Sequence, residues 1–337
     1  MLATSLVALA LAVAAQAGPA LKLTLSGNKS FSGVDKAVIT ATLTNVGDEA
    51  AKLLNEPNTV LSKMETNTFA IANVEGMTPK FVGKIVKYVP TVNGEATTLA
   101  PGESVTVSHD LSSAYDFRRT GAGDYSFETS SSAFTLVTES GLQTIFAETE
   151  AHEAKLAGEL YKPIQQVSKR ATYTSCTSAR QTSIAAAIPG AQSYVANAYA
   201  YLVNHTATST RYTTWFGTWT SARRTTVLTH YSNLNSRAYS GYTYDCSCTD
   251  SAYAYTYAST TGQMWFCNAY WSAPTTGTDS KAGTMVHEST HWSAIAGTGD
   301  YAYGQSAAKS LAISSPAQAV QNADSHEYFA ENNPALS

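Results

Sequence analysis

Residues 283–292 read GTMVHESTHW and contain the pattern His-Glu-x-x-His. In an α-helix, residues four apart lie on the same face, so His287 and His291 can both reach one metal ion. Glu288 is offset around the helix, where a carboxylate can take a proton from a water molecule and pass it to a leaving amine. The stretch therefore predicts a helix that binds a catalytic zinc ion.

The flanking sequence favours a helix around this pattern. Asp279 or Ser280 can cap its start, KAGTMVHESTHWSAIA carries an apolar stripe, and Gly297 can end it. A chance match to the pattern is roughly a one-in-a-hundred event for a chain with this content of His and Glu. Two ordinary helix histidines therefore remain the alternative on this pattern alone.

A catalytic zinc ion requires a third protein ligand, and the residues alone leave two options open. Asp300 follows the helix in AGTGDYAYG, where Gly297 and Gly299 allow the chain to turn back sharply toward the metal. The other option is a glutamate from a later helix, either Glu327 or Glu331.

The composition of the chain changes near Lys169-Arg170. Residues 1–170 hold 14 of the 21 Lys and Arg and 17 of the 25 Asp and Glu, whereas all four Cys and all five Trp come after residue 170. A dibasic pair in a secreted chain is a typical processing site. We therefore expect cleavage after Arg170, with residues 18–170 as a propeptide and 171–337 as the catalytic domain.

The N-terminal residues indicate secretion. Residues 6–14 form an apolar run, and Ala15-Gln16-Ala17 is a small-x-small sequence typical of signal-peptide cleavage. The run is too short to span a membrane comfortably, so we expect a signal peptide over 1–17 and an extracellular protein. In such a protein four cysteines predict two disulfides, and their spacing leaves the pairing open: Cys176, Cys246, Cys248 and Cys267.

The first half is predicted to be an all-β propeptide, an antiparallel sandwich. Alternating apolar and polar residues predict strands at Leu21–Gly27, from Ala37 onward and within LAPGESVTVSHDL, and a closing hairpin in GAGDYSFETSSSAFTLV. Residues 147–166 are left open between a helix and an exposed linker. This half has no catalytic constellation and no cysteine, so it cannot inhibit by offering a thiolate to zinc.

The second half is predicted to be a mainly α, zincin-like domain with a small β-hairpin sheet. Residues 178–206 are rich in Ala, with helical spacing of apolar residues after Pro189, whereas CSCTDSAYAYTYASTTGQMWFC alternates and predicts a hairpin. SSPAQAVQNADSHEYF predicts a later helix, capped by Ser314 or Ser315 and with Pro316 in its first turn.

Two adjacent motifs carry a family resemblance. HESTH followed by GTGDYAYG resembles the deuterolysin-type, or aspzincin, metallopeptidases, whose pattern is His-Glu-x-x-His followed by Gly-Thr-x-Asp-x-x-Tyr-Gly. Residues 297–304 match the second part without departure. RYTTWFG, APTTGTDS and NADSHEYFAENNPA are most similar to the fungal peptidyl-Lys metalloendopeptidases of this family.

The resemblance assigns roles to individual residues. It implies one catalytic zinc ion held by His287, His291 and Asp300, with Glu288 as the general base. It implies that Tyr303, rather than its neighbour Tyr301, donates a hydrogen bond to the developing oxyanion. It also implies disulfides that pair Cys176 with Cys246 and Cys248 with Cys267.

Two later acids bear on the substrate. Asp324 and Glu327 are three residues apart, so they share a face if this stretch is helical and could bind one ammonium group; a solvated acidic face is the alternative. The resemblance implies that they bind the lysine after the scissile bond, at P1′. Residues 171–337 contain two lysines against eleven in 1–170, which favours Lys over Arg, and a compact ammonium suits a small acidic pocket.

These observations predict a secreted, monomeric zinc endopeptidase that cleaves proteins and peptides before lysine and is made with its own propeptide. The net charge of −4 gives no electrostatic case for nucleic acid or an anionic membrane as a partner. Two alternatives remain. One is a broad-specificity deuterolysin-like protease, and the other is a non-catalytic carbohydrate-binding module whose aromatic residues stack on sugars.

Overall fold

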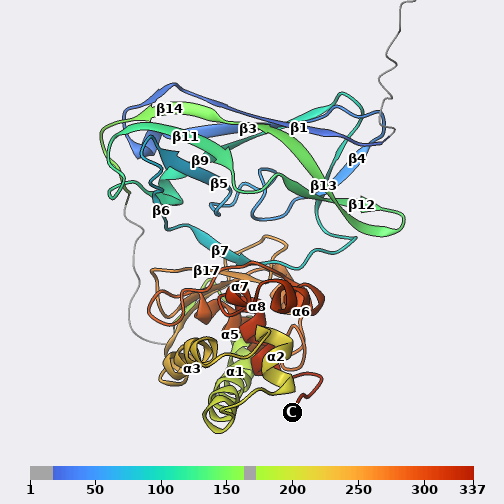
Figure 1. The fold of residues 1–337 in the computed structure, drawn as a ribbon, viewed down its shortest axis with the longest axis vertical. Coiled ribbons are helices and arrows are strands. Elements are labelled where there is room, and N and C mark those ends of the chain that lie inside the picture. Colours follow the sequence, from blue (N-terminus) through green and yellow to red (C-terminus); the bar gives the residue numbers. More distant parts are fainter. Residues whose placement is uncertain (1–17, 163–171) are drawn as a thin grey trace, which may run out of the picture.

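The computed structural model describes residues 18–162 and 172–337, which form a β-rich N-terminal domain and a C-terminal domain that carries all of their α-helices (Figure 1). The expected signal peptide over 1–17 and the expected processing site at Lys169-Arg170 lie outside the described residues. In the described parts of the chain, no helix has both the length and the hydropathy that crossing a bilayer requires.

In the N-terminal domain, over residues 18–162, two larger sheets enclose one hydrophobic core, and there is a further sheet of two strands. Its strands are β1 (Leu21–Gly27), β2 (Ser30–Phe31), β3 (Val38–Asn45), β4 (Ala51–Leu54), β5 (Phe69–Asn73), β6 (Lys80–Phe81), β7 (Lys84–Lys87), β8 (Ala96–Leu99), β9 (Ser104–Asp110), β10 (Tyr115–Asp116), β11 (Gly123–Thr129), β12 (Ala133–Thr138), β13 (Gly141–Glu150) and β14 (His152–Leu156). One sheet has the order β8-β4-β12-β13-β1-β3-β9 and the other the order β2-β14-β11-β5. Leu23 and Ile39 from the first sheet share a buried cluster with Tyr125 and Phe127 from the second.

Three local predictions for this domain are wrong. The sheets are not purely antiparallel, because β1 pairs in parallel with β13 and β2 with β14. The strands β11 and β12 do not form a hairpin; β11 pairs with β5 and β14, whereas β12 pairs with β4 and β13. Of residues 147–166, those at 147–150 and 152–156 are strand, in β13 and β14, rather than helix or linker; 157–162 are neither helix nor strand, and 163–166 lie outside the described residues.

Over residues 172–337, the C-terminal domain combines eight α-helices with short strands. Its elements are β15 (Thr172–Thr174), α1 (Ser178–Asn204), α2 (Thr210–Phe216), α3 (Ser221–Asn235), β16 (Thr243–Asp245), β17 (Ala254–Tyr257), β18 (Gln263–Phe266), α4 (Asn268–Ser272), α5 (Lys281–Thr290), α6 (Gly304–Ser314), α7 (Pro316–Ala319) and α8 (Ala323–Glu331). Aromatic side chains from α2, α3, β16 and α8 fill much of its core, including Trp215, Tyr231, Tyr244 and Phe329.

The predicted fold class, a mainly α domain with a hairpin sheet, is wrong. The described residues are about 31% helix and 29% strand, and the helices of the C-terminal domain lie beside a five-stranded mixed sheet of order β15-β16-β18-β17-β7. β15 and β16 run parallel to their neighbours, so only β17 and β18 form an antiparallel pair within the domain. The prediction failed because β15 and β16 have three residues each, too few for a periodic pattern.

Two disulfides tie this sheet to the helices next to it. Cys176 pairs with Cys246, which joins the start of α1 to the end of β16, and Cys248 pairs with Cys267, which closes the segment that contains β17 and β18. This is the pairing that the family resemblance implied.

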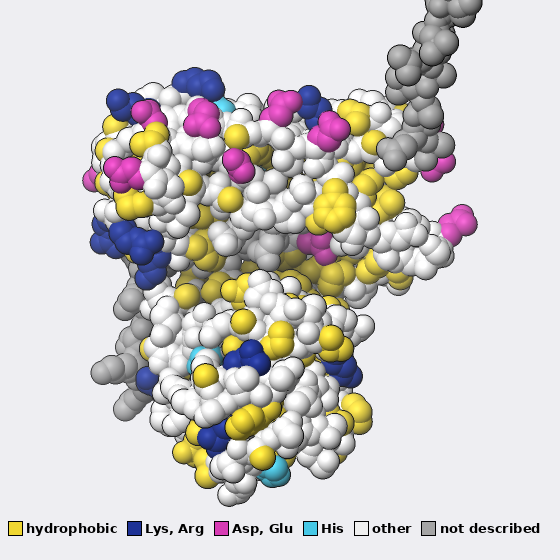
Figure 2. Space-filling model, in the orientation of Figure 1, with side chains coloured by type: hydrophobic (Ala, Val, Ile, Leu, Met, Phe, Trp, Pro, Cys, Tyr) yellow, Lys and Arg dark blue, Asp and Glu magenta, His cyan; other side chains and the backbone are white. Residues whose placement is uncertain are grey.

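The fifth strand of the sheet comes from the N-terminal domain. β7 pairs antiparallel with β17, with Lys84 opposite Tyr257 and Lys87 opposite Ala254, and lies across the top of the C-terminal domain (Figure 1). Figure 2 shows acidic side chains gathered over the N-terminal domain and hydrophobic ones where the two domains meet. The two halves of the chain therefore share one sheet.

Candidate active site

The helix α5 begins and ends on local signals. The Ser280 hydroxyl accepts a hydrogen bond from the Gly283 amide at 2.9 Å and caps the first turn, while His291 stands at the C-terminal end. Met285 and Val286 face the core, and His287, Glu288 and His291 are all fully buried. The helix thus presents both histidines at one point, with ring centroids 4.8 Å apart.

The loop after α5 brings Asp300 to the same point. Gly297 has a φ of 62°, a left-handed conformation that favours glycine and reverses the chain. The Asn322 side chain then holds the loop by accepting hydrogen bonds from the amides of Tyr301 at 2.9 Å and Ala302 at 3.1 Å. Asp300 Oδ1 consequently lies 3.3 Å from His287 Nε2 and 3.5 Å from His291 Nε2.

Both imidazoles turn their Nδ1 atoms toward acceptors; that of His291 is hydrogen-bonded, whereas that of His287 lies close to two carboxylates. His291 Nδ1 lies 2.9 Å from the Thr298 carbonyl oxygen, which can only accept, so Nδ1 carries the proton and Nε2 keeps a lone pair. His287 Nδ1 lies 2.8 Å from Asp324 Oδ1. This arrangement, in which Nδ1 faces an acceptor and Nε2 faces the site, is typical of histidines that bind metal ions.

The atoms that face the site have no hydrogen-bond partners of their own. His287 Nε2, His291 Nε2 and both Asp300 oxygens are buried without one, and one ligand atom from each residue lies within 4.8 Å of the others. Although burial alone would lower it, the Asp300 carboxylate raises the pKa of His287 well above its ordinary value. Buried, unpartnered nitrogen and carboxylate donors in a negative potential fit a divalent cation such as zinc.

Glu288 lies beside these residues with both carboxylate oxygens buried and unpartnered. Burial raises its pKa to about 8, with the His287 imidazole opposing the shift and the Asp300 charge adding to it. A divalent cation on the adjacent histidines would oppose this rise and favour the carboxylate form that a general base needs.

Tyr303 is the residue just before α6, and its hydroxyl points to the edge of this site. The hydroxyl donates to the carbonyl oxygen of Val86 at 3.0 Å and accepts from Asn58 Nδ2 at 3.2 Å. Burial, with the charges of Asp300 and Asp324, raises the pKa of Tyr303 well above its ordinary value. The phenol therefore keeps its proton and acts as a hydrogen-bond donor.

The predicted acids Asp324 and Glu327 lie on α8, which packs against α5, and both are fully buried. They do not form a solvated face. Helix does begin at Pro316 after Ser315, as predicted, but the stretch is two helices rather than one. α7 ends at Ala319, and Asn322, which also holds the Asp300 loop, starts α8.

Both acids approach His287 Nδ1, Asp324 at 2.8 Å and Glu327 at 3.3 Å, but their other neighbours differ. Asp324 faces His287 through Oδ1, and its Oδ2 accepts from the Gly304 amide at 2.6 Å. Glu327 instead binds the ammonium group of Lys87 with both of its oxygens. Although burial alone would raise it, the His287 imidazole and the Lys87 ammonium hold the pKa of Asp324 below its ordinary value.

Lys87, at the end of β7, enters the site from the N-terminal domain. Its side chain and that of Glu327 are both completely buried, at 0% exposure. Burial alone would lower its pKa, but the carboxylates of Glu327, Asp324 and Glu331 raise it above the ordinary value. The acidic pocket on α8 therefore holds a fully charged lysine.

Sequence reasoning missed three residues of this site. The sequence suggested Glu331 only as a possible metal ligand. In the structure it lies in the acidic pocket and accepts hydrogen bonds from the Ser280 amide at 3.0 Å and the Ser280 hydroxyl at 2.8 Å. Its position four residues after Glu327, on the same helix face, was the available signal. Nothing local marked Asn58 or Lys87, which come from the other half of the chain.

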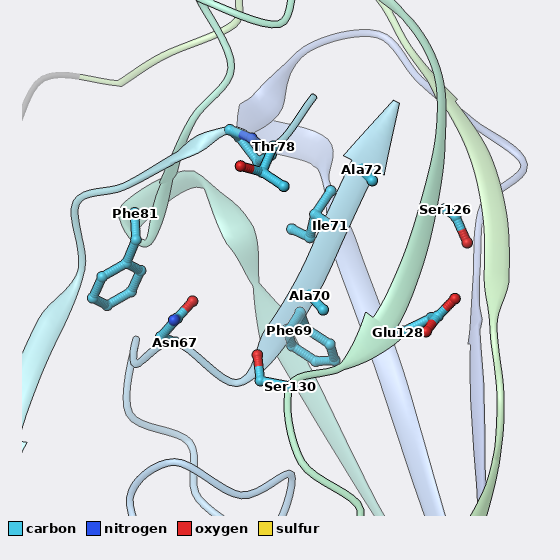
Figure 3. A pocket seen from close by; sticks show the side chains of 11 residues that line it. Asn67, Phe69, Ala70, Ile71, Ala72, Thr78, Phe81, Ser126, Glu128 and Ser130 are labelled. Carbon is cyan, nitrogen blue, oxygen red and sulfur yellow. The ribbon is translucent and has the colours of Figure 1, made fainter. Parts of the chain in front are cut away.

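Two other features of the described residues lack such chemistry. A cavity of about 400 Å³ in the N-terminal domain lies over β5 and β11 (Figure 3), and Glu128 is the single titratable residue among those that line it. Cys248, Asp250 and Cys267 lie close enough to hold a metal, but the two cysteines are joined in a disulfide.

Comparisons with known proteins agree with this chemistry. The profile of the aspzincin family, described as "Lysine-specific metallo-endopeptidase", matches residues 201–331. A peptidyl-Lys metalloendopeptidase of Grifola frondosa is 48% identical over 100% of both chains, and one of Armillaria mellea is 49% identical over 97% of this chain and 95% of its own. A solved zinc peptidase of Grifola frondosa is 56% identical over 48% of this chain and 100% of its own, with a TM-score of 0.48.

Identity of this extent over the whole chain leaves no room for a non-catalytic carbohydrate-binding module. The chain belongs to the aspzincin family of zinc metalloendopeptidases, as its two adjacent motifs indicated.

Proposed function

We propose that the chain is a secreted zinc endopeptidase that hydrolyses peptide bonds on the amino side of lysine. The observation that carries this proposal is the Lys87 ammonium held by Glu327 in a buried pocket beside His287. A pocket that neutralises a buried ammonium favours lysine over an uncharged side chain. If the pocket were empty, or held an apolar side chain, its carboxylates would be left unpaired.

His287, His291 and Asp300 would hold the zinc ion. Their unpartnered buried atoms and the orientation of both imidazoles support this assignment. The ion, when bound, supplies Lewis-acid chemistry that polarises the scissile carbonyl and lowers the pKa of water at the site.

Glu288 and Tyr303 would carry the remaining chemistry. The Glu288 carboxylate takes a proton from the attacking water and transfers it to the nitrogen of the leaving amine. The Tyr303 hydroxyl, kept protonated, donates a hydrogen bond to the carbonyl oxygen as negative charge develops there.

The two lysines of the C-terminal domain are poor targets for such an enzyme. Lys281 is buried, and its ammonium donates to the Ala273 carbonyl oxygen at 2.6 Å. Lys309 is half-buried and donates to Gln305 at 3.1 Å. An enzyme that cleaves before lysine would therefore find few accessible target sites in its own C-terminal domain.

Secretion and processing complete the proposal. Two disulfides in the C-terminal domain are typical of proteins that fold in an oxidising compartment. Removal of residues 1–170 after Lys169-Arg170 would release β7, and Lys87 with it, from the site. The processed chain is proposed to act as a monomer.

Digestion of a denatured protein of known sequence by the processed enzyme tests the proposal. Mass spectrometry should identify peptides that begin with lysine, and these should disappear when a chelator is added. Chelator-sensitive cleavage without a lysine preference would retain the metal site and favour a broad-specificity protease. Lysine cleavage that survives the chelator would reject zinc catalysis.

A further inference from the structure

We propose that β7 occupies the substrate cleft as an internal, substrate-like strand, with Lys87 in the lysine pocket, and thereby keeps the full-length chain latent. The inference rests on the proposed specificity for lysine and adds the means by which the N-terminal domain controls it. Backbone pairing, the carbonyl of Val86 and the ammonium of Lys87 each support it independently.

The backbone of β7 binds as an added strand. Without β7, β17 would be the outer strand of the sheet in the C-terminal domain. Extended peptides commonly bind by adding to such an exposed edge. β7 does so in antiparallel register, and the Lys87 carbonyl oxygen accepts a further hydrogen bond from the Tyr253 amide at 3.0 Å.

The register of β7 matches that of a substrate. An enzyme that cleaves before lysine acts on the carbonyl group of the preceding residue. In this structure that carbonyl belongs to Val86, and its oxygen accepts the hydrogen bond from Tyr303 at 3.0 Å. Two separate features therefore place the same Val86–Lys87 bond at the scissile position: the Lys87 side chain lies in the acidic pocket, and the Val86 carbonyl oxygen accepts from the Tyr303 hydroxyl.

Burial of Lys87 has no evident purpose in the N-terminal domain itself. Its charge is neutralised by Glu327 in the C-terminal domain, and its side chain also lies over the Tyr253 ring at 5.2 Å. A buried ammonium is costly unless it is paired, so this lysine depends on the other domain for its partner.

The N-terminal domain anchors the chain at the start of β7 and also contacts the site directly through Asn58. The Lys84 amide donates to Glu65 at 2.8 Å, the Val82 amide donates to Ala114 at 2.8 Å, and Asn58 donates to the Tyr303 hydroxyl at 3.2 Å. A strand tethered in this way acts at an effective concentration on the order of millimolar, which a free peptide substrate must exceed. Removal of the domain ends this competition.

The test uses the full-length chain with Lys169→Gln and Arg170→Gln to prevent processing. Lys87→Ala should raise hydrolysis of a fluorogenic lysyl peptide by at least about tenfold, because it removes one partner of a buried charge pair. Lys84→Ala is the matched control; Lys84 lies on the same strand but pairs with Glu65 at 2.7 Å, outside the pocket, and this variant should stay latent.

A second measurement requires no change in the pocket and does not depend on activity. Brief acetylation of the native full-length chain, followed by mass spectrometry, should leave Lys87 unmodified while exposed Lys80 reacts. Acetylation of Lys87 at the rate of Lys80 would overturn the inference. The inference would also be overturned if a folded Lys87→Ala variant stayed latent while the processed enzyme still preferred lysine. If the processed enzyme showed no preference for lysine, the proposed specificity would be rejected instead.

Discussion

Nδ1 of His287 lies 2.8 Å from Oδ1 of Asp324, so the first acid of α8 contacts a candidate zinc ligand rather than the lysine ammonium. Among the described acids, Glu327 is the one that forms an ion pair with Lys87. The two acids that the sequence grouped as one lysine pocket therefore separate into two roles. We propose that Asp324 mainly orients the imidazole of His287, and that Glu327, which lies 3.3 Å from the same Nδ1 atom, mainly binds the substrate lysine.

Asp324→Asn should lower zinc affinity by about 10- to 100-fold, because the variant loses the carboxylate that orients and polarises the His287 imidazole. Competition with a chromogenic chelator at buffered free zinc would measure this change. Glu331→Gln is the control, since Glu331 lies in the same pocket but contacts neither histidine. Unchanged zinc affinity together with a selective loss of lysine cleavage would return Asp324 to the lysine pocket, as the sequence alone predicted.

Glu327→Gln should lower kcat/KM for a substrate with lysine at P1′ by on the order of 100-fold, because the buried ammonium loses its charged partner. A substrate with methionine at the same position should be affected far less. The ratio of the two kcat/KM values in the processed enzyme measures the effect. An equal loss on both substrates would show that Glu327 supports the fold of the site rather than its specificity.

Gly283 makes room for the acidic pocket. A Cβ atom at this position would lie 2.0 Å from Glu331 Oε1 and 2.8 Å from Glu327 Oε1. Gly283→Ala should therefore displace the acids, reduce the preference for lysine over methionine, and lower the free energy of unfolding by about 1–3 kcal/mol. Substrate kinetics and urea denaturation would measure the two effects.

Gly241→Ala is the matched control for this change, since a Cβ at Gly241 meets nothing within 4 Å. It should leave both selectivity and stability unchanged. A Gly283→Ala enzyme with undiminished lysine preference would mean that the carboxylates move aside without cost.

The clustering of the three candidate metal ligands could be predicted because its signals are local. His287 and His291 are one helical turn apart, and Asp300 follows a glycine that reverses the chain within the next ten residues. The acids of α8 were predictable only as a group, because helical spacing places Asp324 and Glu327 on one face without specifying what each contacts.

The remaining contacts depend on distant parts of the chain. The pairing of β7 with β17 joins residues that no local pattern connects, and neither the alternation nor the charge of KIVKYVP distinguishes a strand that enters another domain. The incorrect hairpin of β11 and β12 has the same origin. Alternation predicts that both segments are strands, but it does not specify the sheet to which each one belongs.

Glu288→Gln should retain zinc and lower kcat by about 10²- to 10⁴-fold, because the amide has nearly the same shape as the carboxylate but cannot accept the proton of the attacking water. Metal analysis of the purified variant, beside its rate of peptide hydrolysis, separates binding from chemistry. In the metal-free protein the substitution also removes a buried group whose pKa is raised to about 8, so the metal-free variant should be at least as stable to thermal unfolding as the metal-free unmodified protein.

Asp300→Ala provides the contrast for this last prediction. It should lose turnover together with zinc, because Asp300 faces both imidazoles and no other carboxylate in the described residues lies close to both Nε2 atoms. If Glu288→Gln also lost zinc, Glu288 would be required for metal binding, and its role as a general base would have to pass to another group. If it retained both zinc and turnover, proton transfer at this site would not require the carboxylate.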